Sequence, residues 1–449
     1  MNTPICDFVR AYAAAESVRF HMPGHKGKET PGIVPGVRQL DITEIAGADV
    51  LYDARGIIRE SEENAARLFG SARTVYSTEG SSLCIRAMLY LALMHAKFLG
   101  REAKIAAGRN AHRVFLETAA LLDLDVTWLG SGDELLRAKL SPKELEAMFA
   151  VDTAAPTAVY VTSPDYLGNR ADLSRIAEIC HRHGAVLLVD NAHGAYLKFL
   201  ERSEHPLDCG ADLCCDSAHK TLTVLTGGAY LHASRSCPAE LLPMMERAMA
   251  LYASTSPSWL ILQSLDAANA LLAAGYPERI RETVGLLCEV KQHLWEQGWE
   301  QTGDEPLKLT LSPKSKGYTG TKLAELLREK GMVCEFSDPD YLVLMITPEN
   351  TREELDQLLS ALGELPERAP NKTSPPVTER PLPVLRPREA LFCPFERIPV
   401  EESEGRILAS PSVSCPPAVP IVICGERIDR DALEMFRYYG IESCDVIIE

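Results

Sequence analysis

Short apolar runs alternate with amphipathic stretches between about residue 58 and residue 190, and this alternation constrains the fold more than any other feature. The pattern predicts strands at 74–77, 105–107, 126–129, 158–162 and 185–189, and helices at 59–69, 82–98, 114–122 and 173–183. Gly70 follows the first helix in the position of a C-terminal cap. The run from Ala185 to Val189 is apolar throughout, as in a parallel strand buried on both faces. We therefore expect a doubly wound α/β domain with a mainly parallel sheet.

Further domains must accompany this one, because 449 residues exceed what a single simple core usually holds. We expect a large α/β domain at 46–258, preceded by a helix and a loop at 1–45. A linking helix and a small α+β domain should occupy 259–363. A proline-rich linker at 364–388 then leads to a C-terminal subdomain at 389–449.

The net charge of −17 argues against a nucleic-acid partner, because binding phosphates requires a basic surface. An acidic field attracts cationic substrates, although solubility alone is the simpler interpretation. Thirteen cysteines without Cys-x-x-Cys spacing indicate buried thiols in a reducing compartment, and neither a disulfide framework nor a metal site. Charged residues interrupt the first twenty positions, and the longest apolar run is too short to span a membrane. We expect a cytoplasmic enzyme.

Four polar loops follow predicted strands, and ligands of open α/β sheets bind at the carboxyl ends of strands. These loops are Thr78–Ser82, Gly108–His112, Asp190–Gly194 and Asp216–Thr221. The first precedes a long helix, so its free N–H groups with Gly80, Ser81 and Ser82 could form an anion cup. An ordinary helix cap by Ser81 or Ser82 is the alternative.

The other three loops each offer one residue with a possible chemical role. His112 could stack on a flat ring, or it could be a capping or surface histidine. Asp190 ends a buried strand and needs a cation, which a pyridinium nitrogen would supply, although a helix cap is the alternative. Lys220 could form an imine if burial and neighbouring cations lower its pKa, whereas most lysines lie on the surface. His219, beside it, could bind phosphate.

Together, the four loops offer a phosphate grip, a ring clamp, a partner for a ring nitrogen and an imine-forming amine. Pyridoxal 5'-phosphate requires this set of groups. The case depends on the combination, because each loop has an ordinary structural interpretation.

Four motifs resemble those of the Orn/Lys/Arg decarboxylases, which have the aspartate-aminotransferase fold. They are Phe20-His21-Met22-Pro23-Gly24-His25-Lys26-Gly27, Asp190-Asn191-Ala192-His193-Gly194, Ser217-Ala218-His219-Lys220-Thr221-Leu222 and Ser256-Pro257-Ser258-Trp259. Cys415-Pro416-Pro417-Ala418-Val419-Pro420, with Gly425-Glu426, resembles the family's C-terminal signature. The resemblance runs from about residue 4 to the C-terminus and is to the short form, which lacks a receiver-like N-terminal domain.

The resemblance implies a role for each site residue. Lys220 forms the imine with the cofactor, Asp190 pairs with the pyridine nitrogen, and His193 lies beside the ring. His112 stacks on the ring, while Ser81, Ser82 and His219 hold the phosphate, with Gly80 and Ser217 in the same cofactor-binding stretches. Because active sites of this family lie at a dimer interface, we expect a homodimer in which the loop at 256–258 reaches the neighbouring subunit's phosphate.

The chain departs from the family pattern at three positions: Glu79 stands where an amide is frequent, Asn191 where Glu is frequent and Ala418 where Gly is frequent. A carboxylate aimed at a phosphate would be repelled, so we expect Glu79 to point away from the anion cup.

The function implied is decarboxylation of arginine, lysine or ornithine to an amine that serves as a polyamine precursor, with His193 or Lys220 returning the proton. Another reaction of the same cofactor (an aminotransferase, aldolase or lyase reaction) is an alternative, and so is a non-catalytic regulatory homologue. Neither the substrate nor the residues that read its distal cation follow from the sequence.

Overall fold

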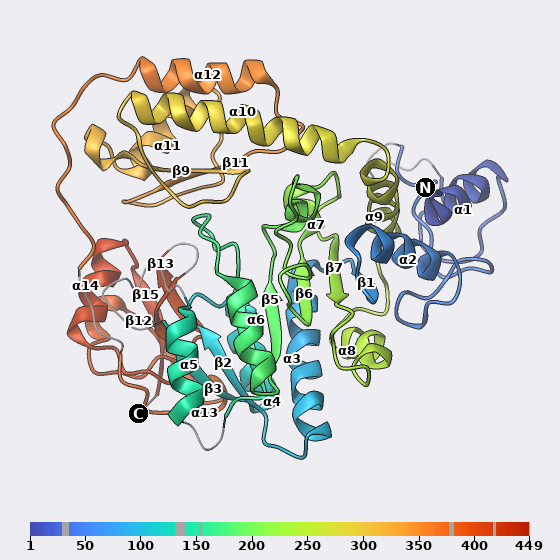
Figure 1. The fold of residues 1–449 in the computed structure, drawn as a ribbon, viewed down its shortest axis with the longest axis horizontal. Coiled ribbons are helices and arrows are strands. Elements are labelled where there is room, and N and C mark those ends of the chain that lie inside the picture. The colour runs from blue at the N-terminus through green and yellow to red at the C-terminus, as the bar shows by residue number, and fades with distance from the viewer. Residues whose placement is uncertain (29–35, 131–139, 152–154, 377–380, 416–418, 449) are drawn as a thin grey trace. The chain divides into compact units, whose positions relative to one another are not determined.

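The computed structural model describes residues 1–28, 36–130, 140–151, 155–376, 381–415 and 419–448. The chain forms two compact units, each built from two separate stretches (Figure 1). The first unit consists of Met1–Glu102 and Leu173–Arg279, and the second of Ala103–Asp172 and Ile280–Glu449.

The first unit contains four strands in the order β1 (Arg73–Ser77), β7 (Ala229–Ala233), β6 (Leu213–Asp216) and β5 (Val186–Asp190). Strands β5 and β6 are parallel, whereas β7 runs antiparallel to both of its neighbours. Every residue of β5 and β6 is buried, as the apolar run predicted. The long helix α3 (Gly80–Phe98) packs against all four strands.

Helix α2 (Ile57–Phe69) is capped at both ends by local sequence. The Asp49 carboxylate accepts hydrogen bonds from the backbone N–H groups of Arg55, Gly56 and Ile58. Gly70 ends the helix with φ of +71°, a left-handed conformation that glycine adopts without steric cost. The predicted C-terminal cap is therefore confirmed. The remaining helices of this unit are α1 (Pro4–Ala14), α6 (Leu173–Arg182), α7 (Ala218–Thr221), α8 (Met245–Ala250) and α9 (Trp259–Leu272).

The second unit contains a parallel run in the order β4 (Ala158–Thr162), β2 (Lys104–Gly108) and β3 (Asp125–Leu129). An antiparallel sheet of β10 (Phe336–Ser337), β11 (Leu342–Met345), β9 (Lys308–Ser312) and β8 (Glu300–Thr302) forms the small α+β domain. The other strands of the second unit form two pairs: β12 (Phe395–Pro399) with β15 (Ser443–Ile447), and β13 (Ser412–Cys415) with β14 (Val419–Ile423). The helices are α4 (Arg113–Leu122), α5 (Pro142–Val151), α11 (Gly320–Glu329), α12 (Arg352–Gly363), α13 (Pro387–Leu391) and α14 (Arg430–Tyr438), and α10 (Tyr276–Glu296) starts in the first unit.

The predicted α/β architecture is confirmed, and each strand predicted between residues 74 and 189 ends within one residue of its expected limits. The N-terminal helix α1 ends at Ala14, and Glu16 just beyond it has φ of +47°. Among the described helices, none is both long enough and apolar enough to cross a bilayer.

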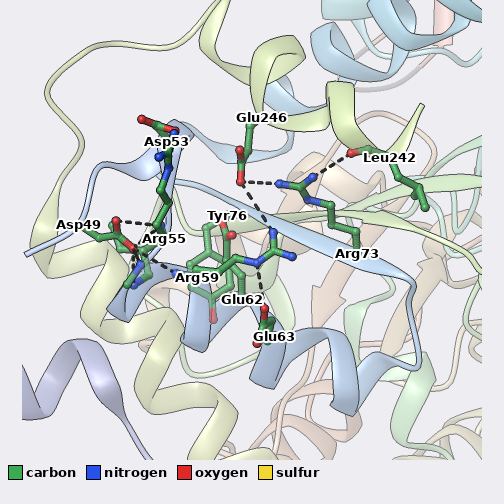
Figure 2. Close-up of polar contacts among 12 residues, drawn as sticks. Asp49, Asp53, Arg55, Arg59, Glu62, Glu63, Arg73, Tyr76, Leu242 and Glu246 are labelled. Carbon is green, nitrogen blue, oxygen red and sulfur yellow. Dashed lines mark hydrogen bonds and ion pairs between the residues drawn. The ribbon is translucent and has the colours of Figure 1, made fainter. Parts of the chain in front are cut away.

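Figure 2 shows a buried carboxyl group, Glu62 of α2, beside strand β1. Glu62 is 1% exposed, and its Oε1 accepts the backbone N–H of Tyr76 at 2.9 Å. Nearby, Arg73 and Arg59 both pair with Glu246. Burial raises the pKa of Glu62 to about 8, despite the opposing effect of the Tyr76 hydrogen bond. The folded protein therefore holds this carboxyl group protonated at neutral pH.

Replacing Glu62 with Gln should abolish a pH dependence of stability. An unfolded Glu ionises near pH 4.3, so the folded state binds one more proton between there and about pH 8, and stability falls as pH rises through this window. The slope should approach about 1.4 kcal/mol per pH unit. Glu62→Gln keeps the acceptor for Tyr76, so thermal unfolding from pH 5 to 9 should show a flatter profile and a higher midpoint at pH 8.

The neighbouring Glu63 is the control, because its side chain is half exposed and bonds only to Arg59 among the described contacts. Glu63→Gln should leave the pH profile of unfolding as it is in the unmodified protein. A Glu62→Gln profile as steep as the parent's would contradict the proposed protonation.

Candidate active site

Two neighbouring strands position Lys220 and His193, the two residues at the centre of the site. Strands β5 and β6 are parallel, and Asp190 at the end of β5 lies opposite Cys215 of β6. The loop after β5 and the loop after β6 therefore leave the sheet at the same edge. The Asn191 N–H donates to the Cys215 carbonyl at 3.0 Å. Beyond β6, Ser217 leads into the short helix α7, which carries His219 and Lys220.

The Lys220 Nζ lies 3.0 Å from Nε2 of His193. His193 is 6% exposed, and Lys220 is half-buried. A protonated Lys220 donates to an unprotonated Nε2, and with that donor the proton of neutral His193 lies on Nδ1. The structure thus brings together two residues that sequence reasoning placed in separate loops, and one can hand a proton to the other.

The Asp190 carboxylate is buried, at 3% exposure. Its Oδ1 accepts the N–H of Ala192 at 3.2 Å and lies 3.6 Å from the Cys215 thiol, which donates to it. The Cys215 thiol is fully buried, which raises its pKa well above the ordinary value, so it stays protonated as a donor. Two donors therefore orient the carboxylate from one side.

The N-terminus of α3 has the properties of an anion cup. Glu79 occupies the cap position but makes no side-chain cap, and its carboxylate instead accepts the N–H of Ser254 at 2.8 Å. Gly80 has φ of +72°, and a Cβ built on it would meet no atom within 4 Å, so the space in front of the helix is open. Ser217 donates to the Ser81 hydroxyl at 2.9 Å, which links this terminus to the lysine loop. Neither Ser81 nor Ser82 is the helix cap, because α3 starts at Gly80.

His219 has a fixed tautomer in its neutral form. Its Nδ1 lies 2.9 Å from the Gly228 carbonyl, so Nδ1 carries a proton and donates. Partial burial lowers the pKa of His219, and the Lys220 charge acts in the same direction. Neutral His219 thus presents an unprotonated Nε2, which is an acceptor. Holding a phosphate through Nε2 requires His219 to take up a proton.

His112 belongs to the second unit, where it precedes helix α4. Its Nδ1 accepts the N–H of Val114 at 3.3 Å, which is the capping role that sequence reasoning had left open as an alternative. Its stacking role stays a prediction.

Arg109, three residues earlier in the same loop, is 1% exposed and forms two hydrogen bonds of 2.7 Å to the Glu426 carboxylate. Glu426 also accepts the N–H of Ile423, at 2.9 Å. The loop of His112 is therefore anchored to the C-terminal signature motif. The signature position Ala418 lies outside the described residues.

The loop after β4 was missed by sequence reasoning. A small cavity at the ends of β2 and β4 is lined by Asn110, Thr162, Asp165, Asn169 and Arg170. The same strand-end rule that selected the other four loops would have selected this one. Asp165 is held by the backbone and side chain of Asn169, both at 2.8 Å, and burial raises its pKa.

Asp216 lies at the centre of a fully buried polar group. His205 Nε2 donates to its Oδ2 at 2.9 Å, and His232 Nε2 lies 3.4 Å from the same oxygen. Metal ligands can be arranged in this way, and the three side chains are close enough to share an ion. However, the Leu207 N–H points at Nδ1 of His205 at 3.4 Å, which places the imidazole proton on Nε2, towards Asp216. The arrangement is therefore a hydrogen-bonded network around a carboxylate.

Comparison with known proteins identifies the family. Residues 3–302 match the major domain of the Orn/Lys/Arg decarboxylases, and residues 377–443 match their C-terminal domain. An arginine decarboxylase from Halalkalibacterium halodurans is 30% identical over 97% of this chain and 93% of its own length. An arginine decarboxylase from Bacillus subtilis is 29% identical over 96% of this chain and 92% of its own length.

Among solved structures, the constitutive lysine decarboxylase of E. coli superimposes with a TM-score of 0.78 at 18% identity, covering 100% of this chain and 82% of that chain. This likeness supports the fold, while the family follows from the sequence matches over most of the chain. The chain belongs to the Orn/Lys/Arg decarboxylase family.

Proposed function

We propose that this chain is a pyridoxal-phosphate-dependent decarboxylase whose substrate is arginine. The observation that carries the reaction is the Lys220–His193 pair, 3.0 Å apart at the carboxyl edge of the sheet. The choice of arginine rests on relatives named arginine decarboxylase, at 27–30% identity over 94–97% of this chain. A lysine decarboxylase from Pseudomonas aeruginosa is less similar, at 22% identity.

The residues present fit the cofactor. The open, uncapped start of α3 supplies backbone N–H groups and the Ser81 and Ser82 hydroxyls for a phosphate. The phosphate charge would favour the protonated form of His219, and the Nε2 proton then becomes a donor to it. Because His219 must take up that proton, phosphate should bind more weakly as the pH rises above the pKa of His219. Asp190 is the buried carboxylate that a ring nitrogen requires.

When bound, pyridoxal phosphate supplies an aldehyde for the Lys220 amine and an electron-withdrawing ring. The chain's residues do the rest. Asp190, oriented by Ala192 and Cys215, stabilises a proton on the ring nitrogen. Neutral His193 holds the Lys220 amine through Nε2 and can take up the proton that the amine releases as it acts as a nucleophile. After CO₂ leaves, the same Nε2–H or the lysine can return a proton to the substrate carbon.

The assembly and location are part of the same proposal. We place the enzyme in the cytoplasm, consistent with cysteines that are mostly buried as free thiols in the described residues. We propose a homodimer in which the loop at 256–258 faces a second copy's site. Within its own chain, the N–H of Ser254 just before this loop donates to Glu79, and Ser258 at its end caps α9. The product would be an amine that serves as a polyamine precursor.

The test is release of ¹⁴CO₂ from carboxyl-labelled arginine, lysine and ornithine by protein supplied with pyridoxal phosphate. Arginine should give the largest kcat/KM, by at least about tenfold, which corresponds to about 1.4 kcal/mol of transition-state discrimination. Keto-acid release measured in parallel separates an aminotransferase from a decarboxylase. A higher rate on lysine or ornithine would overturn the substrate assignment. Absence of CO₂ from all three would overturn the function and favour the regulatory alternative.

A further inference from the structure

Asp216 is fully buried and accepts hydrogen bonds from Asn191 and His205, and His232 lies close to it. Asn191 Nδ2 donates to Oδ1 at 2.7 Å, while His205 and His232 converge on Oδ2. The histidines hold the pKa of Asp216 well below its ordinary value, although burial opposes them. The carboxylate is therefore ionised and serves as a pure acceptor.

Asp216 and Asn191 belong to the two loops that form the site. Asp216 ends β6 directly before Ser217 and α7, which carries Lys220. Asn191 lies in the loop that carries His193. A Cβ on Gly194 would lie 2.0 Å from Asn191 Oδ1, so a glycine is required for the amide to adopt this orientation. The Asn191–Asp216 bond thus ties together the chain segments on which His193 and Lys220 are mounted.

Asn191 also explains a departure from the family pattern. A glutamate at this position would place a second carboxylate against ionised Asp216 in a fully buried environment. Two like charges there would repel strongly, whereas an amide N–H satisfies the carboxylate. Asn191 and Asp216 therefore form a matched pair in this chain.

His205 and His232 contact Asp216 at Oδ2, the carboxylate oxygen that does not bond to Asn191. His232 lies on β7, and its Nδ1 is 2.8 Å from the Thr74 hydroxyl of β1. The Phe69 ring lies 4.5 Å from His232 and 5.4 Å from His205, between ring centroids. The carboxylate is thus shielded from water, which strengthens its hydrogen bonds.

We propose that Asp216 is a positioning residue that sets the Lys220–His193 contact through Asn191. The inference takes Lys220 to be the reactive amine, as in the proposed function, but its test does not depend on decarboxylation. A hydrogen bond to His193 favours the charged form of the Lys220 amine. Loosening Asp216 should therefore lower the pH at which Lys220 becomes reactive.

The readout is the pH midpoint of Lys220 labelling by acetic anhydride, measured by peptide mass spectrometry on folded protein freed of cofactor. Asp216→Asn should lower this midpoint by about one pH unit, a shift expected for losing one hydrogen bond to a charged group. His193→Ala should produce a similar shift. The double variant should show no further shift, because both changes remove the same contact.

Asp212, directly before the first residue of β6, provides a matched control. It is also a buried aspartate, and it accepts from His181 at 3.0 Å and from the Leu187 N–H at 2.7 Å. Asp212→Asn should lower the thermal midpoint of unfolding but leave the Lys220 labelling midpoint in place. Equal shifts in Asp212→Asn and Asp216→Asn would overturn the positioning role, because the effect would then follow from general loss of stability.

If Asp216→Asn fails to fold, Asn191→Ala tests the same proposal. This change removes the bond between Asp216 and the His193 loop, while His205 and His232 stay beside Asp216. The expected result is the same downward shift of the Lys220 midpoint. An unchanged midpoint in folded Asn191→Ala or Asp216→Asn would refute the proposal. If the shift occurs in protein that releases no CO₂, the proposed function fails while the positioning role stands.

Discussion

Lys220→Ala should lower kcat for amino-acid decarboxylation by at least about 10³-fold, because the variant loses the amine that we propose forms the imine and that lies beside His193. It should also lack the visible absorbance band that we expect the parent protein to acquire with pyridoxal phosphate. The measurements are CO₂ release at saturating substrate and an absorbance spectrum of the reconstituted protein.

Lys143→Ala is the control, because Lys143 lies exposed on α5 and belongs to the second unit. That variant should retain the activity and the absorbance band. A Lys220→Ala protein that keeps the band would show that another amine binds the cofactor. Its far-ultraviolet circular dichroism should match the parent's, so that loss of activity reflects chemistry and not unfolding.

Arg109→Met should destabilise the second unit by about 3–5 kcal/mol, because removing one partner of a buried ion pair leaves the other charge unpaired. Glu426 is 4% exposed and would lose both of its 2.7 Å bonds to the guanidinium. Urea denaturation followed by tryptophan fluorescence measures the change. Arg109→Met with Glu426→Gln should recover part of the loss, because the second change removes the stranded charge.

Arg397 offers a matched comparison, since it also makes two hydrogen bonds to one carboxylate, that of Asp445. The Arg397 side chain is 71% exposed, so water screens this pair. Arg397→Met should cost less than about 1 kcal/mol. Similar losses of unfolding free energy in Arg109→Met and Arg397→Met would contradict the view that burial determines how much stability an ion pair's removal costs.

The strand ends could be predicted because they depend on short-range patterns. Apolar runs of about five residues and the glycine at position 70 fix β1 to β5 and the end of α2 with no knowledge of distant residues. The loops at the strand ends could also be predicted, because the carboxyl ends of neighbouring parallel strands lie at the same edge of the sheet. The strand-end rule therefore selects Asp190 and Lys220, whereas the role of His193 follows from the family resemblance.

The contacts that join distant residues could not be predicted in the same way. Asp216 was identified only as the start of the lysine motif, and His205 and His232 had no pattern that linked them to it. Their meeting depends on the antiparallel placement of β7, which places His232 opposite Cys214 on β6. Arg109 and Glu426 are 317 residues apart, and only folding of the second unit brings them together. The resemblance implied which residues serve the cofactor, but not what holds them.

The Glu62 side chain has a second consequence, which concerns association between molecules. Strand β1 pairs with β7 and lies at the end of its sheet order, so within the described chain one side of it is an open edge. Open edges recruit strands from other molecules and start aggregation. Glu62 occupies the Tyr76 N–H on β1, and α2 packs against the strand. A carboxyl group that costs stability when ionised thus also closes a docking position for a foreign strand.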